Sequence, residues 1–274
     1  MRIGHRYLSL GLALSLTGAL VAGCASTTKS GSVGADRRQL LLVSESQVDA
    51  MAVQAYQQAL GQAHKAKKLN TDAPLVKRVR AIAHRLIPQV GVFRPDALKW
   101  QWEVNVIDSD ELNAWCMQGG KIAVYTGIVN KLKLTDDELA AIMGHEMSHA
   151  LREHSREQLS QSLATQVGVN IGAAVLGLGA LGGNLINQGA NLMLTLPNSR
   201  QAEREADRMG VELAARAGYD PRAAVKVWQK MSAFGGGAQP PAWLSTHPSH
   251  AERTADLTRY AAIVMPLYTK AKKG

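Results

Sequence analysis

Two histidines four residues apart, His145 and His149, enclose a glutamate within one expected helix. On a helix, positions four apart lie about 40° from each other around the axis, so both imidazoles point the same way and can bind one metal ion. Zinc takes imidazole nitrogens at about 2.0–2.1 Å. Glu146, beside the first histidine, can take a proton from an attacking water, as the glutamate does in His-Glu-x-x-His metalloproteases. The spacing predicts zinc-assisted peptide hydrolysis with Glu146 as general base.

A catalytic zinc needs a third protein ligand and an open position. Downstream, Glu203 and Asp207 are four residues apart on another expected helix and share a face, whereas Glu205 points elsewhere. Glu203 can complete a His-His-Glu ligand set, and Asp207 can accept a hydrogen bond from a ligand imidazole and orient it. The alternative is a solvated acidic face that pairs with the neighbouring arginines.

The elements that must position these residues can be read from the pattern. Helices are expected over 44–68, 72–90, 136–154, 200–217, 221–234 and 249–265, and extended runs over 99–107, 113–118 and 121–129. Thr135 and Glu138 form a capping box at the start of the helix that carries His145, and Gly119-Gly120 indicates a hairpin. The alternative, a chance pair of surface histidines, is less expected, because the capping box gives this helix a clear start directly after the extended runs. The fold class is α+β: a zincin-type metallopeptidase domain, mostly helical, with a small sheet beside the active-site helix.

The N-terminus has the order of an export signal. Arg2 and Arg6 precede an uncharged, mostly apolar run over 7–21, and small residues lead to Cys24. This order resembles a bacterial lipobox, in which residues 1–23 are removed and Cys24 is lipidated. A permanent membrane anchor is the weaker alternative, because the run falls short of the ~20 residues that a spanning helix prefers.

These features divide the chain into a signal peptide (1–23), a lipid-anchored flexible tether (24–43) of small polar residues and a single peptidase domain (44–274). The formal net charge is +9, but no basic cluster with interleaved aromatics occurs, so no nucleic-acid partner is expected. With Cys24 acylated, Cys116 has no intrachain partner and is either buried or open to pairing between chains.

Residues 158–199 contain no charged side chain and are rich in Gly, Ala, Leu and Asn. Three interpretations stay open for this insertion. It can form a helical hairpin packed beside the active site, a mobile lid, or a surface that contacts lipid or an unfolded client.

Four motifs, in this order, resemble the HtpX and CAAX-prenyl-protease family of gluzincins: NAWCMQGGKIAVYTG, LTDDELAAIMGHEMSHALREH, EREAD and THPSHAER. The likeness covers roughly Lys99 to Arg259. Within the family, the chain is most similar to periplasmic lipoprotein members of the LoiP (YggG) type, with BepA-like members more distant.

The resemblance implies that His145, His149 and Glu203 bind one Zn²⁺, that Glu146 is the base, and that Asp207 orients a ligand. It also implies protein or peptide substrates, namely unfolded or misassembled envelope proteins, a periplasmic location with a lipid anchor in the outer membrane, and contact with the outer-membrane protein assembly machinery. A chaperone-like or autoinhibited assembly factor with little proteolysis is the alternative.

Further site residues follow from the same resemblance. Asn113, Ala114 and Trp115 match an edge strand beside the cleft, on which an extended substrate adds main-chain hydrogen bonds. Arg253 matches a residue that can stabilise an oxyanion. His247 can hydrogen-bond there, can swing onto zinc as a shut-off ligand, or can be a loop histidine without a role. The remaining histidines of this region, His154 and His250, are expected at the surface.

Overall fold

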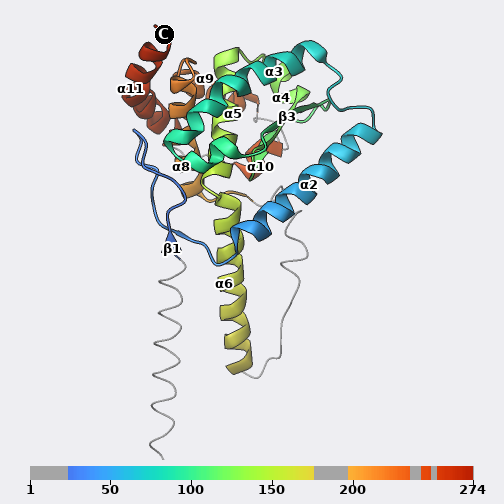
Figure 1. Cartoon of the computed structure of the whole chain (residues 1–274), viewed down its shortest axis with the longest axis vertical. Coiled ribbons are helices and arrows are strands. Elements are labelled where there is room, and N and C mark those ends of the chain that lie inside the picture. The colour runs from blue at the N-terminus through green and yellow to red at the C-terminus, as the bar shows by residue number, and fades with distance from the viewer. Residues whose placement is uncertain (1–23, 176–196, 235–241, 248–251, 274) are drawn as a thin grey trace, which may run out of the picture.

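The computed structural model describes residues 24–175, 197–234, 242–247 and 252–273. Figure 1 shows a mostly helical body with a small sheet, from which one long helix, α6, projects. The helices are α2 (Glu45–Lys65), α3 (Ala73–Leu86), α4 (Thr126–Lys131), α5 (Asp136–Leu151), α6 (His154–Val175), α8 (Arg200–Arg216), α9 (Ala223–Phe234), α10 (Ala242–Thr246) and α11 (Arg253–Ala271), with 3-10 helices at Ile87–Val92 and Pro95–Lys99. The expected α+β class is confirmed.

The sheet of the body has three strands in the order β3-β5-β4. β3 (Glu103–Ile107) is parallel to β5 (Lys121–Tyr125), and β4 (Ala114–Met117) pairs antiparallel with β5. Gly119 and Gly120 turn the chain between β4 and β5 with φ of 78° and 83°, a conformation that favours glycine, so the expected hairpin is confirmed. β4 has a paired neighbour on one side only and is therefore an edge strand of the sheet.

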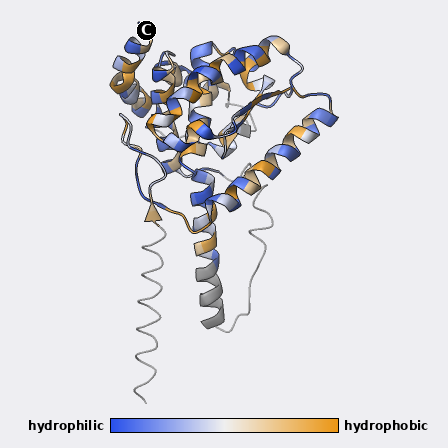
Figure 2. Ribbon diagram, viewed as in Figure 1, coloured by the Kyte–Doolittle hydropathy of each residue, from blue (hydrophilic) through white to orange (hydrophobic). Residues whose placement is uncertain are grey.

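The helices begin where side chains satisfy their free N–H groups. At α5, Thr135 accepts from the backbone of Glu138, and the Glu138 carboxylate accepts from the backbone of Thr135, which confirms the capping box. At α8, the side chain of Ser199 accepts a hydrogen bond from the backbone N–H of Ala202. Figure 2 shows hydrophilic and hydrophobic residues alternating along α2 and α3, as expected for helices with one buried face.

Two glycines let the helices of the site pack closely. A Cβ placed on Gly144 of α5 would lie 2.8 Å from the carbonyl oxygen of Gly210, and one on Gly210 of α8 would lie 2.7 Å from the backbone nitrogen of His145. Both separations are shorter than real Cβ contacts, so any larger side chain would push the two helices apart. The glycine pair sets the short distance across which α8 delivers its acidic side chains to α5.

Several expected boundaries were wrong. The extended run over 121–129 ends at Tyr125, where α4 begins. The run over 99–107 begins as a strand only at Glu103. The helix expected over 72–90 turns into a 3-10 helix after Leu86, next to Pro88, whose ring removes a backbone donor. The helix expected over 136–154 ends at Leu151, because Glu153 has a φ of 52° and separates α5 from α6.

The last helix begins at Arg253 and runs to Ala271, later at both ends than the expected 249–265. Residues 248–251, with the expected histidine His250, lie outside the described residues.

Residues 24–43 do not form a flexible tether; they lie against the domain. β1 (Cys24–Ala25) pairs antiparallel with β2 (Gln39–Leu40), and Val33 and Ala35 are buried. The backbone of this segment also bonds the domain, as where Lys29 N–H donates to the Phe93 carbonyl at 2.8 Å. Small polar residues suggested a tether, but tertiary contacts that composition does not reveal order them.

The first part of the uncharged insertion belongs to α6, and residues 176–196 lie outside the described residues. The described part of the insertion agrees with a helix at its start and does not decide among the three interpretations. In the described parts of the chain, no helix combines the length and the apolar character needed to cross a membrane.

Candidate metal centre

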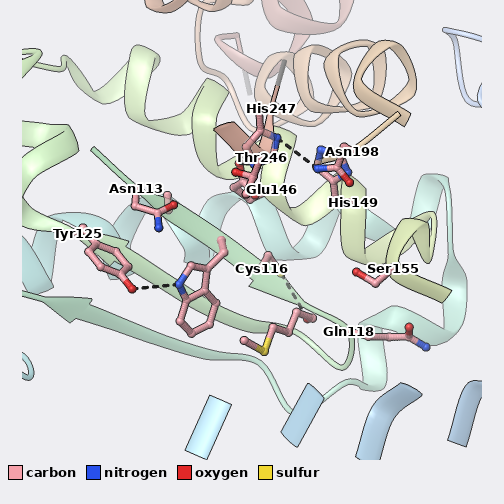
Figure 3. Close-up of a pocket in the computed structure, with 13 residues that line it drawn as sticks. Asn113, Cys116, Gln118, Tyr125, Glu146, His149, Ser155, Asn198, Thr246 and His247 are labelled. Atoms are coloured by element: carbon pink, nitrogen blue, oxygen red, sulfur yellow. Dashed lines mark hydrogen bonds and ion pairs between the residues drawn. The ribbon is translucent and has the colours of Figure 1, made fainter. Parts of the chain in front are cut away.

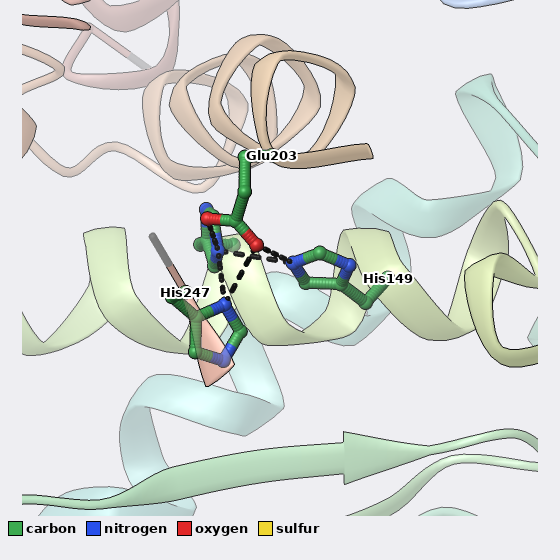
Figure 4. A group of neighbouring side chains, drawn as sticks. His149, Glu203 and His247 are labelled. Atoms are coloured by element: carbon green, nitrogen blue, oxygen red, sulfur yellow. Dashed lines mark hydrogen bonds and ion pairs between the residues drawn. The ribbon is translucent and has the colours of Figure 1, made fainter. Parts of the chain in front are cut away.

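The two histidines of α5 and the first glutamate of α8 meet at the centre of the domain. Four side chains each place one ligand atom within 4.8 Å of the other three: His145, His149, Glu203 and His247. Figure 4 shows His149, Glu203 and His247 converging. His247 reaches this point from the segment that follows α10. The site residues expected from the spacing are thus brought together, with His247 as a fourth.

The donor atoms fit a tetrahedral ion. His145 Nε2 lies 3.1 Å from His149 Nε2 and 3.3 Å from His247 Nδ1. Glu203 Oε1 lies 3.3 Å from His149 Nε2 and 2.9 Å from His247 Nδ1, and Glu203 Oε2 lies 3.6 Å from His145 Nε2. Ligands around tetrahedral zinc at about 2.0–2.1 Å are separated by about 3.3 Å from one another. Three nitrogens and a carboxylate at these separations form a site of the size and chemistry that zinc requires.

The protonation states suit a metal ligand set. Burial lowers the pKa of His149 well below its usual value, so the imidazole is neutral, as coordination requires. Burial by itself would raise the pKa of Glu203, but the neighbouring histidines His247 and His149 outweigh it and hold that pKa well below its usual range. The glutamate is therefore an anionic carboxylate even though it is fully buried.

Asp207 contacts the nitrogen of His145 that faces away from the other ligands, the contact that the sequence suggested for it. His145 Nδ1 lies 3.0 Å from Asp207 Oδ1, and Arg253 donates to the same oxygen at 2.7 Å. Burial would raise the pKa of Asp207, but the Arg253 charge and the hydrogen bond with His145 lower it. An ionised carboxylate here fixes the tautomer of His145 that leaves Nε2 free for a metal.

Arg253 lies behind the ligands. Its guanidinium is 2.9 Å from Glu203 Oε2 and stacks over the Trp228 ring at 3.3 Å from the ring centroid. It is buried and is not among the residues that line the cleft. This geometry favours a role in holding Glu203 and Asp207 over the oxyanion role implied by the resemblance.

Glu146 faces the cleft beside the ligand cluster, and sequence reasoning missed the residue that holds it. The indole Nε1 of Trp243, on α10, donates to Glu146 Oε1 at 2.8 Å, and the Trp243 ring stacks on His247 with centroids 4.7 Å apart. His247 Nε2 in turn lies 3.5 Å from Glu146 Oε1. The only signal in the sequence was that Trp243 stands four residues before His247, one helical turn away.

His154 is not a surface histidine, contrary to expectation. It is buried, its Nδ1 lies 2.8 Å from His149 Nδ1, and its Nε2 lies 3.2 Å from Glu205 Oε2. Glu205, which was expected to point away from the ligands, does so, but into the interior rather than into solvent. A local pattern could not show this, because Arg37 and Arg152, which pair with Glu205, lie far from it in sequence.

The cleft in front of the cluster is bordered by the edge strand. Its lining includes Asn113, Ala114, Trp115, Glu146 and His149, drawn with their neighbours in Figure 3. The three residues expected on an edge strand beside the cleft therefore lie there, although Asn113 immediately precedes β4.

Cys116 also lines the cleft, from β4. It is buried, and burial, together with the nearby Glu146 charge, raises the pKa of its thiol well above the usual value. The thiol is therefore protonated and poorly nucleophilic. Burial was the first of the two expectations for this residue.

A mostly helical domain in which a His-Glu-x-x-His helix meets a glutamate from a second helix defines a zincin-type metallopeptidase. The chain belongs to peptidase family M48: the sequence profile of that family matches residues 74–261. Members of this family are zinc-dependent, which agrees with the His and Glu donors gathered here.

Named relatives agree with this class. The chain is 40% identical over 156 residues to mitochondrial metalloendopeptidase OMA1 of Arabidopsis thaliana, covering 56% of this chain and 30% of that protein. It is 36% identical over 205 residues to the OMA1 of Schizosaccharomyces pombe, covering 74% and 58%. It is 26% identical over 217 residues to the beta-barrel assembly-enhancing protease of Escherichia coli, covering 75% and 42%. The chain thus spans less than two thirds of the length of these relatives.

Proposed function

We propose that the protein is a zinc-dependent endopeptidase in which His145, His149 and Glu203 hold the metal and Glu146 is the general base. The observation that carries the proposal is the convergence of three ligand atoms beside a glutamate in a cleft bordered by a free strand edge. A structural zinc site would have no use for a general base beside the metal, whereas Glu146 lies in the cleft next to the ligands.

Zinc held here would polarise the scissile carbonyl and acidify the attacking water. The protein supplies the remaining functions. Glu146 accepts the proton from the water and delivers it to the leaving amine. Trp243 holds the carboxylate of Glu146, which lines the cleft, through its 2.8 Å hydrogen bond to Oε1. Asp207 and Arg253 hold His145 and Glu203 in place.

The substrate is a peptide in extended form. Tyr125 N–H donates to the Asn113 carbonyl at 3.1 Å, so Asn113 exchanges hydrogen bonds with β5. Because such pairs alternate along an antiparallel ladder, Ala114 and Cys116 direct their main-chain groups to the free edge. An unfolded segment can add a strand there, whereas a folded protein has no free backbone to offer. This geometry supports unfolded or misassembled proteins as the substrates.

We further propose an envelope location, as a periplasmic lipoprotein of the LoiP type anchored in the outer membrane through Cys24. The support is the signal-like order of residues 1–23 and the lipobox-like residues before Cys24. The Escherichia coli relative, by its name, enhances β-barrel assembly, which supports contact with outer-membrane protein assembly.

A second candidate is a latched, chaperone-like state with little proteolysis. His247 favours it, because its Nδ1 occupies the fourth corner of the donor set, 2.9 Å from Glu203 Oε1 and 3.3 Å from His145 Nε2. A nitrogen in that corner takes the position that water or substrate needs.

The test measures zinc content and casein cleavage in the mature protein for wild type, Glu146→Gln and Glu111→Gln. Glu111 is an exposed glutamate outside the cleft lining and serves as the matched control. Zinc in all three, with cleavage lost only in Glu146→Gln and abolished by chelation in the others, is the expected result.

Zinc in all three with cleavage in none would favour the latched state. Metal-replete wild-type protein without zinc would overturn the proposal. Cleavage by Glu146→Gln at the wild-type rate would remove the assigned base.

A further inference from the structure

One buried cluster of charged and titratable side chains next to the metal centre has no part in the mechanism above. It comprises His154, Glu205 and Arg152, each at most 3% exposed. The cluster lies on the outer side of His149, away from the cleft. What it does for His149 depends on the proposed zinc site, so the inference below rests on the proposed function.

Two short contacts join His149 to a carboxylate through a second imidazole. His149 Nδ1 lies 2.8 Å from His154 Nδ1, with ring centroids 4.9 Å apart. His154 Nε2 lies 3.2 Å from Glu205 Oε2. The Nε2 of His149 faces Glu203 and the other ligands. Both nitrogens of both rings are therefore committed.

The three side chains His149, His154 and Glu205 form a hydrogen-bonded row, and the metal end of this row determines where its hydrogens lie. When His149 Nε2 carries a metal, its Nδ1 must carry the hydrogen and donate. Among the described residues, the acceptor within reach of that group is His154 Nδ1, which must then carry no hydrogen. A neutral His154 then has its hydrogen on Nε2, and that group donates to the Glu205 carboxylate. The row has one consistent arrangement of hydrogens and it needs an acceptor at its far end.

Two arginines keep Glu205 an acceptor. Arg152 Nε and Nη2 donate to Glu205 Oε2 at 3.1 and 3.0 Å. Arg37, from the N-terminal segment, donates to Oε1 at 2.6 Å. Both arginines can only donate hydrogen bonds, so the carboxylate oxygens of Glu205 are the acceptors in each of these contacts. The direction in which hydrogen bonds are donated along the row, from His149 toward Glu205, is thus set by arginines outside the metal centre.

We propose that His154 and Glu205 are positioning residues for His149: they fix the tautomer that presents Nε2 to zinc and hold the ring in its orientation. Asp207 does the same for His145 with a carboxylate in direct contact. For His149 the carboxylate acts through an intervening imidazole. Partners of this kind typically change metal affinity about 10–100-fold when they are removed.

The test compares His154→Leu with His154→Asn. Leucine fills the space but accepts no hydrogen bond, whereas the asparagine Oδ1 occupies about the position of Nδ1 and accepts. His84→Leu, at an exposed helical histidine, is the matched control. The readout is the zinc dissociation constant, measured by competition with a chromogenic chelator. We expect it to rise about 10–100-fold in His154→Leu, and less than about tenfold in His154→Asn.

A second measurement needs no substitution. Histidine nitrogen NMR of the zinc-loaded wild type should show hydrogen on Nδ1 of His149 and on Nε2 of His154. Hydrogen on Nδ1 of His154, or His154→Leu binding zinc as tightly as wild type, would overturn the inference and leave the proposed endopeptidase intact. Wild-type protein that binds no zinc would overturn both. Equal weakening of zinc binding by leucine and asparagine would show that an acceptor at the position of Nδ1 is not what His149 needs, and would also overturn the inference.

Discussion

The indole of Trp243 donates a 2.8 Å hydrogen bond to the carboxylate of Glu146, and no other side chain of the described structure holds that oxygen so closely. Trp243 also stacks on His247, so one ring contacts both the base and the fourth member of the donor set. Movement of α10 would therefore reposition the base and the fourth donor together.

Trp243→Phe tests this contact. Phenylalanine keeps a ring to pack on His247 but donates no hydrogen bond to Glu146. Because a hydrogen bond to a charged group contributes about 1.5–3 kcal/mol, we expect kcat/KM for a peptide substrate to fall about 10–100-fold with zinc content unchanged. Trp100→Phe, a tryptophan outside the cleft, is the control. Unchanged kcat/KM would mean that Glu146 needs no such support.

His247→Ala tests the fourth corner of the donor set. Alanine removes the nitrogen that lies 3.3 Å from His145 Nε2 and opens that corner. If the closed arrangement holds about 90% of molecules, opening it raises cleavage about tenfold. Casein cleavage per bound zinc is the measurement, with exposed His64→Ala as the control. A lower rate per zinc would assign His247 to the reaction instead of to a latch.

Ala114→Pro tests the free strand edge. Ala114 directs its N–H away from β5, so proline removes a group that a substrate would use and leaves the β4–β5 ladder intact. One lost substrate hydrogen bond, at about 1 kcal/mol, together with the bulk of the ring, should raise KM by about fivefold or more. Ala114→Ser keeps the N–H and serves as the control. Equal KM values in both variants would exclude strand addition at this residue.

Arg37→Ala tests the attachment of the N-terminal segment through pH. Burial alone would raise the pKa values of Glu157 and Glu205, but hydrogen bonds from Arg37 and from other partners outweigh it and lower both. Carboxyls with a folded-state pKa below the unfolded value of about 4.3 stabilise the fold above that pH, and the stabilisation is lost as the pH falls through the folded-state pKa.

We therefore expect Arg37→Ala to lower the free energy of unfolding by about 1 kcal/mol at pH 7, a modest value because a third of the Arg37 side chain is exposed to solvent. The difference from wild type should shrink in acid, as urea unfolding at a series of pH values can show. Arg38→Ala, whose guanidinium bonds the Cys24 carbonyl, should give a difference independent of pH. A constant Arg37→Ala difference would contradict the assigned pairing.

The parts of the site that follow helical spacing could be predicted from sequence. His145 and His149, and likewise Glu203 and Asp207, are each four residues apart, and the structure brings the two pairs together. Caps are local as well, so Thr135 marked the start of α5. What spacing alone could not show is how closely α5 and α8 approach, which depends on Gly144 meeting Gly210.

The misses come from tertiary contacts. His154 and Glu205 have the local pattern of surface residues, and only the return of the N-terminal segment with Arg37 encloses them. Residues from Thr126 onward have the composition of a strand, yet the Thr126 hydroxyl bonds the chain near Ser109, and helix α4 begins there. In each case the deciding partner is distant in sequence.

The pairing of β1 with β2 has a mechanical consequence. Cys24 is part of β1, at the same end of the body from which α6 projects (Figure 1). A lipid on Cys24 would hold the domain close to the bilayer, because the residues after Cys24 pack against the domain and do not form a flexible linker. The fold would then set the distance between the cleft and the bilayer. The enzyme would cut only those substrate segments that extend to that distance from the membrane.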